Sequence, residues 1–106
     1  MSEPTIRITE YGIVEMNKAT VSEFYSSELK FVDLYANEDE QTIGFKEIKE
    51  PNENSFRVNT IESDVYIDLE DSFERFKKYY DIDTDKKYNP KIDNPNEDLE
   101  LVIIEL

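Results

Sequence analysis

Two helix-like stripes of apolar residues, each flanked by short strand-like runs, constrain the fold of this chain more than any other feature. Spacings of four, three and four residues, typical of one helix face, separate the apolar residues Leu69, Phe73, Phe76 and Tyr80. The first half holds a shorter stripe at Val21, Phe24 and Tyr25, preceded by Asn17, a residue type that favours helix N-caps. Each stripe therefore predicts a short amphipathic helix.

Short runs rich in β-branched and aromatic residues lie before and after both stripes. Tyr11-Gly12 is a two-residue hairpin signal between the first two runs, and the polar segment Ala36–Gln41 joins the next two. Asp68 is expected to cap the second helix, and Asp93–Asp98 to form the last turn. The expected strands are Thr5–Glu10, Ile13–Met16, Phe31–Tyr35, Thr42–Lys49, Phe56–Asn59, Val65–Ile67, Tyr88–Ile92 and Leu99–Leu106.

The order of these elements predicts an α+β fold of two short helices with β-hairpins, in one domain over residues 1–106. Pro51–Ser55 clusters turn formers without an apolar residue and divides the chain into segments 5–50 and 55–106. Hairpin, helix and hairpin occur in both segments. The recurrence indicates either a degenerate internal duplication of a β-β-α-β-β unit or the ordinary make-up of a small α+β domain.

This layout resembles the swapped-hairpin unit of AbrB/SpoVT-like proteins. The resemblance rests on three segments, which are Ile8–Met16, Phe31–Tyr35 and Ile43–Ile48. It implies two interlocking units, here within one chain. Members of that family bind DNA through basic residues around the first hairpin, whereas this chain has Glu10, Tyr11 and Glu15 there, with Arg7 as the only cation. The resemblance thus concerns the fold and not DNA binding. The same layout also looks like small uncharacterised proteins of viruses and mobile elements.

A strongly acidic balance limits the partners of this chain. The sequence has 26 acidic and 12 basic side chains, a formal charge of −14, and both halves carry an acidic excess. Such a surface repels nucleic acid and anionic membranes and attracts proteins that present basic clefts.

The absence of two residue types removes whole classes of chemistry. Without Cys there is no disulfide framework, thiolate metal site or cysteine nucleophile, and without His there is no Ser–His machinery or imidazole ligation. No run approaches the roughly 20 apolar residues of a membrane span, and the start MSEPTIRITE is unlike a signal peptide. We expect a soluble cytoplasmic protein without a cofactor, located in the host cytoplasm if its source is a virus.

One motif invites a metal-site interpretation. The carboxylates of Asp81, Asp83 and Asp85 match the start of a calcium-binding loop. The match fails at the sixth position, which is Lys86 instead of Gly, and at the twelfth, which is Ile92 instead of Glu. We therefore expect a solvated acidic loop and no metal site. Paired carboxylates are unavoidable among 26, so they do not indicate an enzyme, and none is predicted.

The tyrosines allow two interpretations. They are either interface anchors or residues that pack the margin of a small core, and the second is favoured for most of them. Tyr79-Tyr80 is the exception, because adjacent residues of a helix do not face the same core.

These observations predict a non-enzymatic protein that acts by binding, as an acidic mimic of nucleic acid that inhibits a DNA- or RNA-binding protein. Such inhibitors are typical of viral or mobile-element anti-defence proteins. The partner would present a basic cleft, and the chain would be a monomer or a homodimer. An alternative is a salt-adapted AbrB-like regulator or antitoxin whose acidity serves only solubility. The candidate partner-binding carboxylates are those of Glu62, Asp64, Asp68, Glu70, Asp71, Glu74, Asp81, Asp83 and Asp85.

Overall fold

The computed structural model describes residues 3–106 and is predominantly β, with 45% of the chain in strands and 14% in helices. The expected α+β class is therefore wrong. The helices are α1 (Lys18–Phe24) and α2 (Ser72–Tyr79). The strands are β1 (Ile6–Ile8), β2 (Ile13–Met16), β3 (Phe31–Asn37), β4 (Thr42–Ile48), β5 (Phe56–Ile61), β6 (Asp64–Asp68), β7 (Lys87–Tyr88), β8 (Lys91–Asn96) and β9 (Leu99–Glu105).

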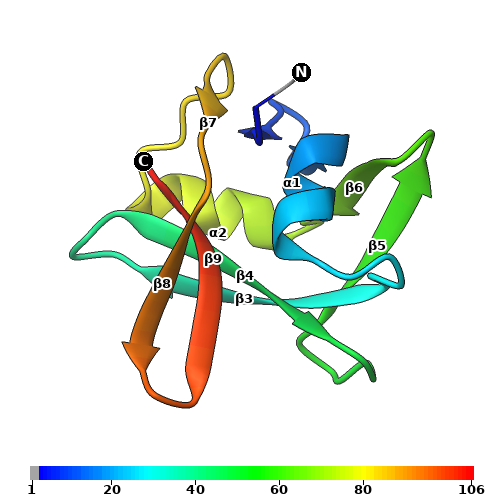
Figure 1. The fold of residues 1–106 in the computed structure, drawn as a ribbon. Helices are drawn as coiled ribbons and strands as arrows, with labels where there is room; N and C mark the ends of the chain where they lie inside the picture. The colour runs from blue at the N-terminus through cyan, green and yellow to red at the C-terminus, as the bar shows by residue number, and fades with distance from the viewer. Residues whose placement is uncertain (1–2) are drawn as a thin grey trace.

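All nine strands belong to one antiparallel sheet in the order β7-β1-β2-β6-β5-β3-β4-β9-β8. Strand β5 joins its two parts. Phe56 and Arg57 pair with β3, whereas Val58–Ile61 pair with β6. The sheet curls strongly into an open half-barrel, so that the β5–β6 and β8–β9 hairpins lie on opposite sides of the β3–β4 hairpin in Figure 1.

The predicted duplication into two β-β-α-β-β units is also wrong. Hairpins from the two halves alternate in the sheet, because β6 pairs with β2 and β9 pairs with β4. Neither half forms a continuous sheet by itself, and the second half has an additional strand, β7, which pairs with β1. A two-stranded hairpin with one apolar face is marginally stable in water. The curled sheet covers those faces only when both halves contribute.

The concave side of the sheet holds the core. Alternate residues of β1, β2 and β6 point inward, as the buried Val14 and Met16 of β2 and the buried Val65 and Ile67 of β6 illustrate. Phe45 of β4 is the largest fully buried side chain. Residues from both halves form this one core, with Thr20 as the single buried polar residue among those described.

Helix α1 begins where its cap was predicted. The side chain of Asn17 accepts a hydrogen bond from the amide of Thr20 at 3.0 Å, so the prediction of this N-cap is confirmed. The same Asn17 oxygen accepts from the amide of Thr5 at 3.1 Å, and its Nδ2 donates to the carbonyl of Glu3 at 2.8 Å. Asn17 therefore joins the helix to the segment before β1.

The N-cap of α2 lies three residues after the expected one. Asp68 is the last residue of β6, where it pairs with Ile13, and its side chain accepts from the amide of Glu70 at 2.9 Å. Asp71 is the N-cap instead, without a side-chain cap hydrogen bond. Asp68 thus pairs within the sheet and does not cap the helix.

The last hairpin also differs from the prediction. Strand β8 extends to Asn96 and includes most of the expected turn Asp93–Asp98. A bulge between Asp93 and Asn96 accommodates Pro95, which has no amide hydrogen to donate.

Gly12 positions α2 against the first hairpin. It has φ of +79°, and a Cβ at this position would lie 2.7 Å from Cγ of Phe73. Its carbonyl accepts from the amide of Leu69 at 2.9 Å. Only a glycine permits this turn and this approach of the α2 side chain together.

Candidate interaction surface

The nine carboxylates predicted to bind a partner occupy three separate places. Glu62 and Asp64 lie at the tight turn between β5 and β6, at the opposite end of β6 from Asp68. A second group follows the end of β6 into α2, and the third lies in the loop after α2. The second group consists of Asp68, Glu70, Asp71 and Glu74. The third group consists of Asp81, Asp83 and Asp85.

The group at the β5–β6 turn is partly structural. Asp64 is half-buried, and its Oδ1 accepts a hydrogen bond from the amide of Lys18 at 3.0 Å, at the first turn of α1. Glu62 has φ of +51° in the turn itself and is exposed. The structure therefore separates this pair from the other predicted carboxylates.

The group at the start of α2 consists of exposed carboxylates. Glu70 has φ of +52° in the turn that leads to the helix. Glu74 forms an ion pair with Lys77 at 3.0 Å. Negative side chains at a helix N-terminus are stabilised by the helix dipole, so this end of α2 tolerates concentrated acidity.

The Asp81–Asp85 loop is held by its own hydrogen bonds. Oδ1 of Asp83 accepts from the amide of Asp85 at 2.9 Å, and the amide of Asp83 donates to the hydroxyl of Tyr88 at 3.0 Å. Among residues 3–106 no three acidic side chains converge closely enough to hold a metal ion.

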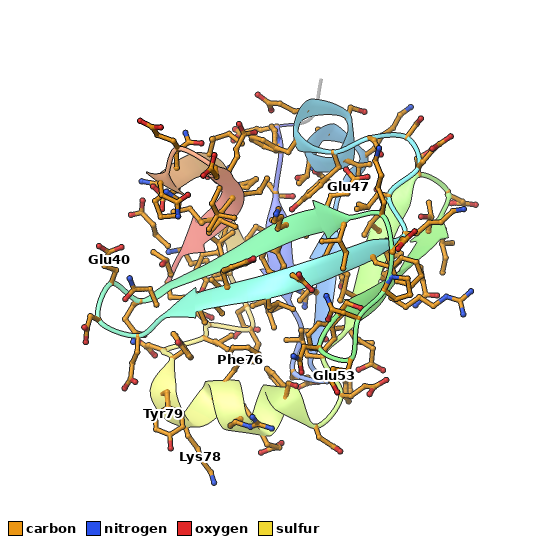
Figure 2. The ribbon with its side chains drawn as sticks, turned by 90° about the horizontal axis from the view of Figure 1, so that it is seen from below. Glu40, Glu47, Glu53, Phe76, Lys78 and Tyr79 are labelled. Atoms are coloured by element: carbon orange, nitrogen blue, oxygen red, sulfur yellow. The ribbon has the colours of Figure 1, made fainter. Side chains whose placement is uncertain are left out.

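Three further carboxylates, missed by the sequence analysis, lie beside the C-terminal end of α2. Glu38, Asp39 and Glu40 form the turn between β3 and β4, and Figure 2 shows Glu40 at its tip. Gln41 ties this turn to the helix end, since its Nε2 donates to the carbonyl of Tyr79 at 3.1 Å and its Oε1 accepts from the amide of Asp81 at 2.9 Å. The polar loop Ala36–Gln41 was recognised in the sequence, but its position beside α2 was not.

The two adjacent tyrosines at the end of α2 differ in exposure, as expected for neighbouring residues at a helix end. Tyr79 is 55% exposed and points away from the sheet with Lys78, as Figure 2 shows. Tyr80 packs on the core margin, with its ring 5.7 Å from that of Phe76. Burial, and secondarily the charge of Glu38, raises the pKa of the Tyr80 hydroxyl.

Few of the carboxylates are neutralised by a neighbouring cation. In residues 3–106, which include all 26 acidic side chains, ion pairs involve only three of them. Glu15 pairs with Arg7 at 3.5 Å, Glu74 with Lys77, and Glu105 with Lys91. The hydrogen bond to Glu105 raises the pKa of Lys91. The other carboxylates have no cationic side chain within 4.0 Å among residues 3–106.

An open cleft of about 650 Å³ lies between the loop that precedes β5 and the N-terminal end of α2. Its polar lining includes Arg57, Arg75 and Asn59. A more apolar cleft of about 430 Å³ continues from it along α2, and four residues line both, namely Asn54, Phe56, Ser72 and Arg75. In Figure 2, Glu53 lies in the loop that precedes β5, and Phe76 points from α2 toward β3.

Comparisons with known proteins found no relative. No family model matches the sequence, and neither the curated proteins nor the solved structures gave a match. The resemblance to AbrB/SpoVT-like units and the resemblance to small viral proteins stay predictions. Within residues 3–106 neither helix is long and apolar enough to cross a membrane.

Proposed function

We propose that this protein inhibits a DNA- or RNA-binding protein by presenting carboxylates at the positions where that partner binds phosphates. The observation that carries the proposal is the small share of compensated charge, with three ion pairs among 26 carboxylates. Unpaired carboxylates keep the protein's field strongly negative, and such a field accelerates association with a basic cleft.

The two ends of α2 supply a spacing that suits this role. Asp68, Glu70 and Asp71 lie before the helix, and the Glu38–Glu40 turn lies beside its last residues. An eight-residue helix is roughly 12 Å long, which is close to the width of about 12 Å of the DNA major groove between its phosphate strands. Arg75, Lys77 and Lys78 occupy the helix between the two acidic ends, so the negative charge lies at the ends and not along the helix.

The partner class is a protein with a basic nucleic-acid-binding cleft, such as a nuclease, a CRISPR effector or a repressor. Viral or mobile-element anti-defence proteins are the setting in which such an inhibitor acts. The salt-adapted regulator is the competing function, and in that case the acidic groups would have no specific partner.

Competition with DNA tests the proposal. The protein is immobilised and exposed to a lysate at low salt, and captured proteins are quantified before and after excess duplex DNA is added. We expect nucleic-acid-binding proteins to be captured and then released by DNA. The triple variant Asp68→Lys, Asp71→Lys, Glu74→Lys should weaken capture several-fold to about a hundredfold, mainly through the association rate.

A second triple variant separates position from total charge. Glu97→Lys, Asp98→Lys and Glu100→Lys make the same charge change on exposed residues around the β8–β9 turn. This variant should retain most of the capture. If both variants fold by circular dichroism and lose capture equally, or if DNA releases nothing, the proposed function is wrong.

A further inference from the structure

Two of the chain's three arginines line the cleft of about 650 Å³. Arg57 comes from the start of β5 and Arg75 from the middle of α2, eighteen positions later in the sequence. Both are exposed. Strand pairing of β5 with β3 and the packing of Phe73 under the first hairpin bring these two elements to opposite walls.

Neither guanidinium group takes part in an ion pair within residues 3–106. Four carboxylates line the same cleft, namely those of Glu53, Asp68, Glu70 and Asp71. None of them lies within 4.0 Å of either arginine, and within residues 3–106 the ion pairs use other cations. In a chain with 26 acidic side chains, two free guanidinium groups that share a cleft are available to an external anion.

The adjoining cleft supplies an apolar surface and no acidic side chain. Leu34, Phe56, Phe76, Tyr79 and Tyr80 line it together with Arg75, Asn54 and Ser72. Arg75 thus borders both the polar cleft and the apolar one. Mostly apolar lining with a few convergent polar groups is typical of a recognition site.

We propose that this double cleft binds a segment of a partner protein in which a carboxylate follows directly after an aromatic or branched aliphatic side chain. The carboxylate lies between Arg57 and Arg75, and the apolar side chain packs on Phe56, Phe76 and Tyr80. This binding mode differs from the proposed phosphate mimicry because it recognises an acidic group and not a basic one, and Asp68, Glu70 and Asp71 border both surfaces.

Local charge favours a carboxylate over a phosphate. Four carboxylates against two guanidinium groups leave the polar cleft at −2. A phosphate group with a charge near −2 meets roughly twice the repulsion that a carboxylate with a charge of −1 meets at the same distance. A cation later in the bound segment would in turn be attracted by Glu53 and Asp71.

A titration with two matched peptides tests this inference. ¹⁵N-labelled full-length protein is titrated with N-acetyl-Phe-Glu-amide and with its isostere N-acetyl-Phe-Gln-amide, and chemical shifts are followed by NMR. We expect saturable shifts at Asn54, Ser72 and the arginine side chains, with the Glu peptide binding about tenfold more tightly because of charge-assisted bidentate hydrogen bonds.

Variants of the cleft decide where the peptide binds. Arg57→Gln and Arg75→Gln should each weaken the Glu peptide several-fold and leave the Gln peptide unchanged. Lys78→Gln removes one charge from the same helix on the side away from the sheet, and should have little effect. All three positions are exposed, so the fold is expected to persist.

Three results would overturn the inference. The first is the absence of saturable shifts from either peptide by about 10 mM. The second is equal affinity of the Glu and Gln peptides. The third is tighter binding of adenosine monophosphate than of the Glu peptide, which would identify a phosphate site. None of these results bears on DNA competition, so this inference and the proposed function fail separately.

Discussion

The two helices of this protein differ in how their surroundings hold them. Helix α1 begins at an Asn17 whose side chain hydrogen-bonds to the helix and to the segment before β1, and Thr20 of this helix is fully buried. Helix α2 has no side-chain cap bond, is acidic at both ends, and adjoins two connected clefts. Among the residues of α2, Phe73 is the one that is buried in the core.

This contrast separates a region whose polar groups bond one another from a region whose polar groups remain accessible. Around α1 polar groups bond one another, as when the Tyr25 hydroxyl donates to the carbonyl of Phe45 at 3.1 Å and Ser26 donates to Glu47. Around α2 the carboxylates and the two cleft arginines remain accessible. Unused polar groups next to exposed aromatic side chains are typical of interaction surfaces.

The largest expected effect tests how far α2 depends on one anchor. Phe73→Ala should lower the free energy of unfolding by about 3–5 kcal/mol, because it leaves a cavity under Gly12 and removes a nearly fully buried ring. Tyr79→Ala, at an exposed position of the same helix, should cost less than about 1 kcal/mol. Urea denaturation measures both, and equal losses would contradict the assignment of Phe73 as the anchor.

Alkaline pH should weaken the α1 region selectively. Burial, and secondarily the charge of Glu47, raises the pKa of the Tyr25 hydroxyl in the folded protein above its usual value near 10. The contribution of the protonated Tyr25 hydroxyl to the free energy of unfolding is therefore complete below about pH 10. Above that pH the contribution falls by about 1.4 kcal/mol per pH unit.

Tyr25→Phe isolates this effect. The variant should be about 1 kcal/mol less stable at pH 7, where the hydrogen bond to Phe45 is lost, but should lose less stability than wild type between pH 10 and 12. Tyr79→Phe serves as the exposed control. Parallel stability curves for wild type and Tyr25→Phe would show that Tyr25 does not cause the alkaline sensitivity.

The two N-caps should respond differently to the same truncation. Asn17→Ala should destabilise the protein by about 1–2 kcal/mol, because the amides of Thr5 and Thr20 lose their acceptor. Asp71→Ala should change stability by less than about 0.5 kcal/mol, since its side chain makes no cap bond. Thermal unfolding of both variants provides the measurement, and a comparable loss for Asp71→Ala would remove the contrast between the helices.

The smallest expected effect concerns salt. Screening should relieve repulsion at the acidic ends of α2 and stabilise the protein by about 1 kcal/mol between 10 and 150 mM salt, with the larger gain in amide protection at α2. The protein should remain folded at low ionic strength. Unfolding at low salt with a steep gain toward molar salt would favour the salt-adapted regulator.

Local interactions explain which predictions from the sequence are confirmed. The Asn17 cap depends on an amide only three residues away, so the residue types suffice to predict it. Val21, Phe24, Phe76 and Tyr80 do pack on the core, as their helical spacing indicates. Asp68 was misplaced because its amide and carbonyl belong to a strand that pairs with β2, and this partner lies over fifty residues away in the sequence.

The candidate surface was predicted only in part for the same reason. The acidity of Asp68–Glu74 is visible in the sequence, and the structure keeps those residues together. Placing Glu38–Glu40 at the opposite end of α2 requires the hydrogen bonds of Gln41 to that end of the helix. The cleft between Arg57 and Arg75 was not predicted, because no spacing in the sequence relates a strand residue to a helix residue across it.

The sequence by itself determined the charge, the exclusion of His and Cys chemistry, the approximate positions of both helices and most strands, and the first helix cap. These properties depend on composition or on residues within about four positions of one another. Only the tertiary structure decided the strand order, in which β6 pairs with β2 and β9 with β4, and therefore the β-dominated class. Several pairings satisfy the same alternation of apolar and polar residues equally well. The choice among them follows from covering every apolar face at once, which is a property of the whole curled sheet and of no single segment.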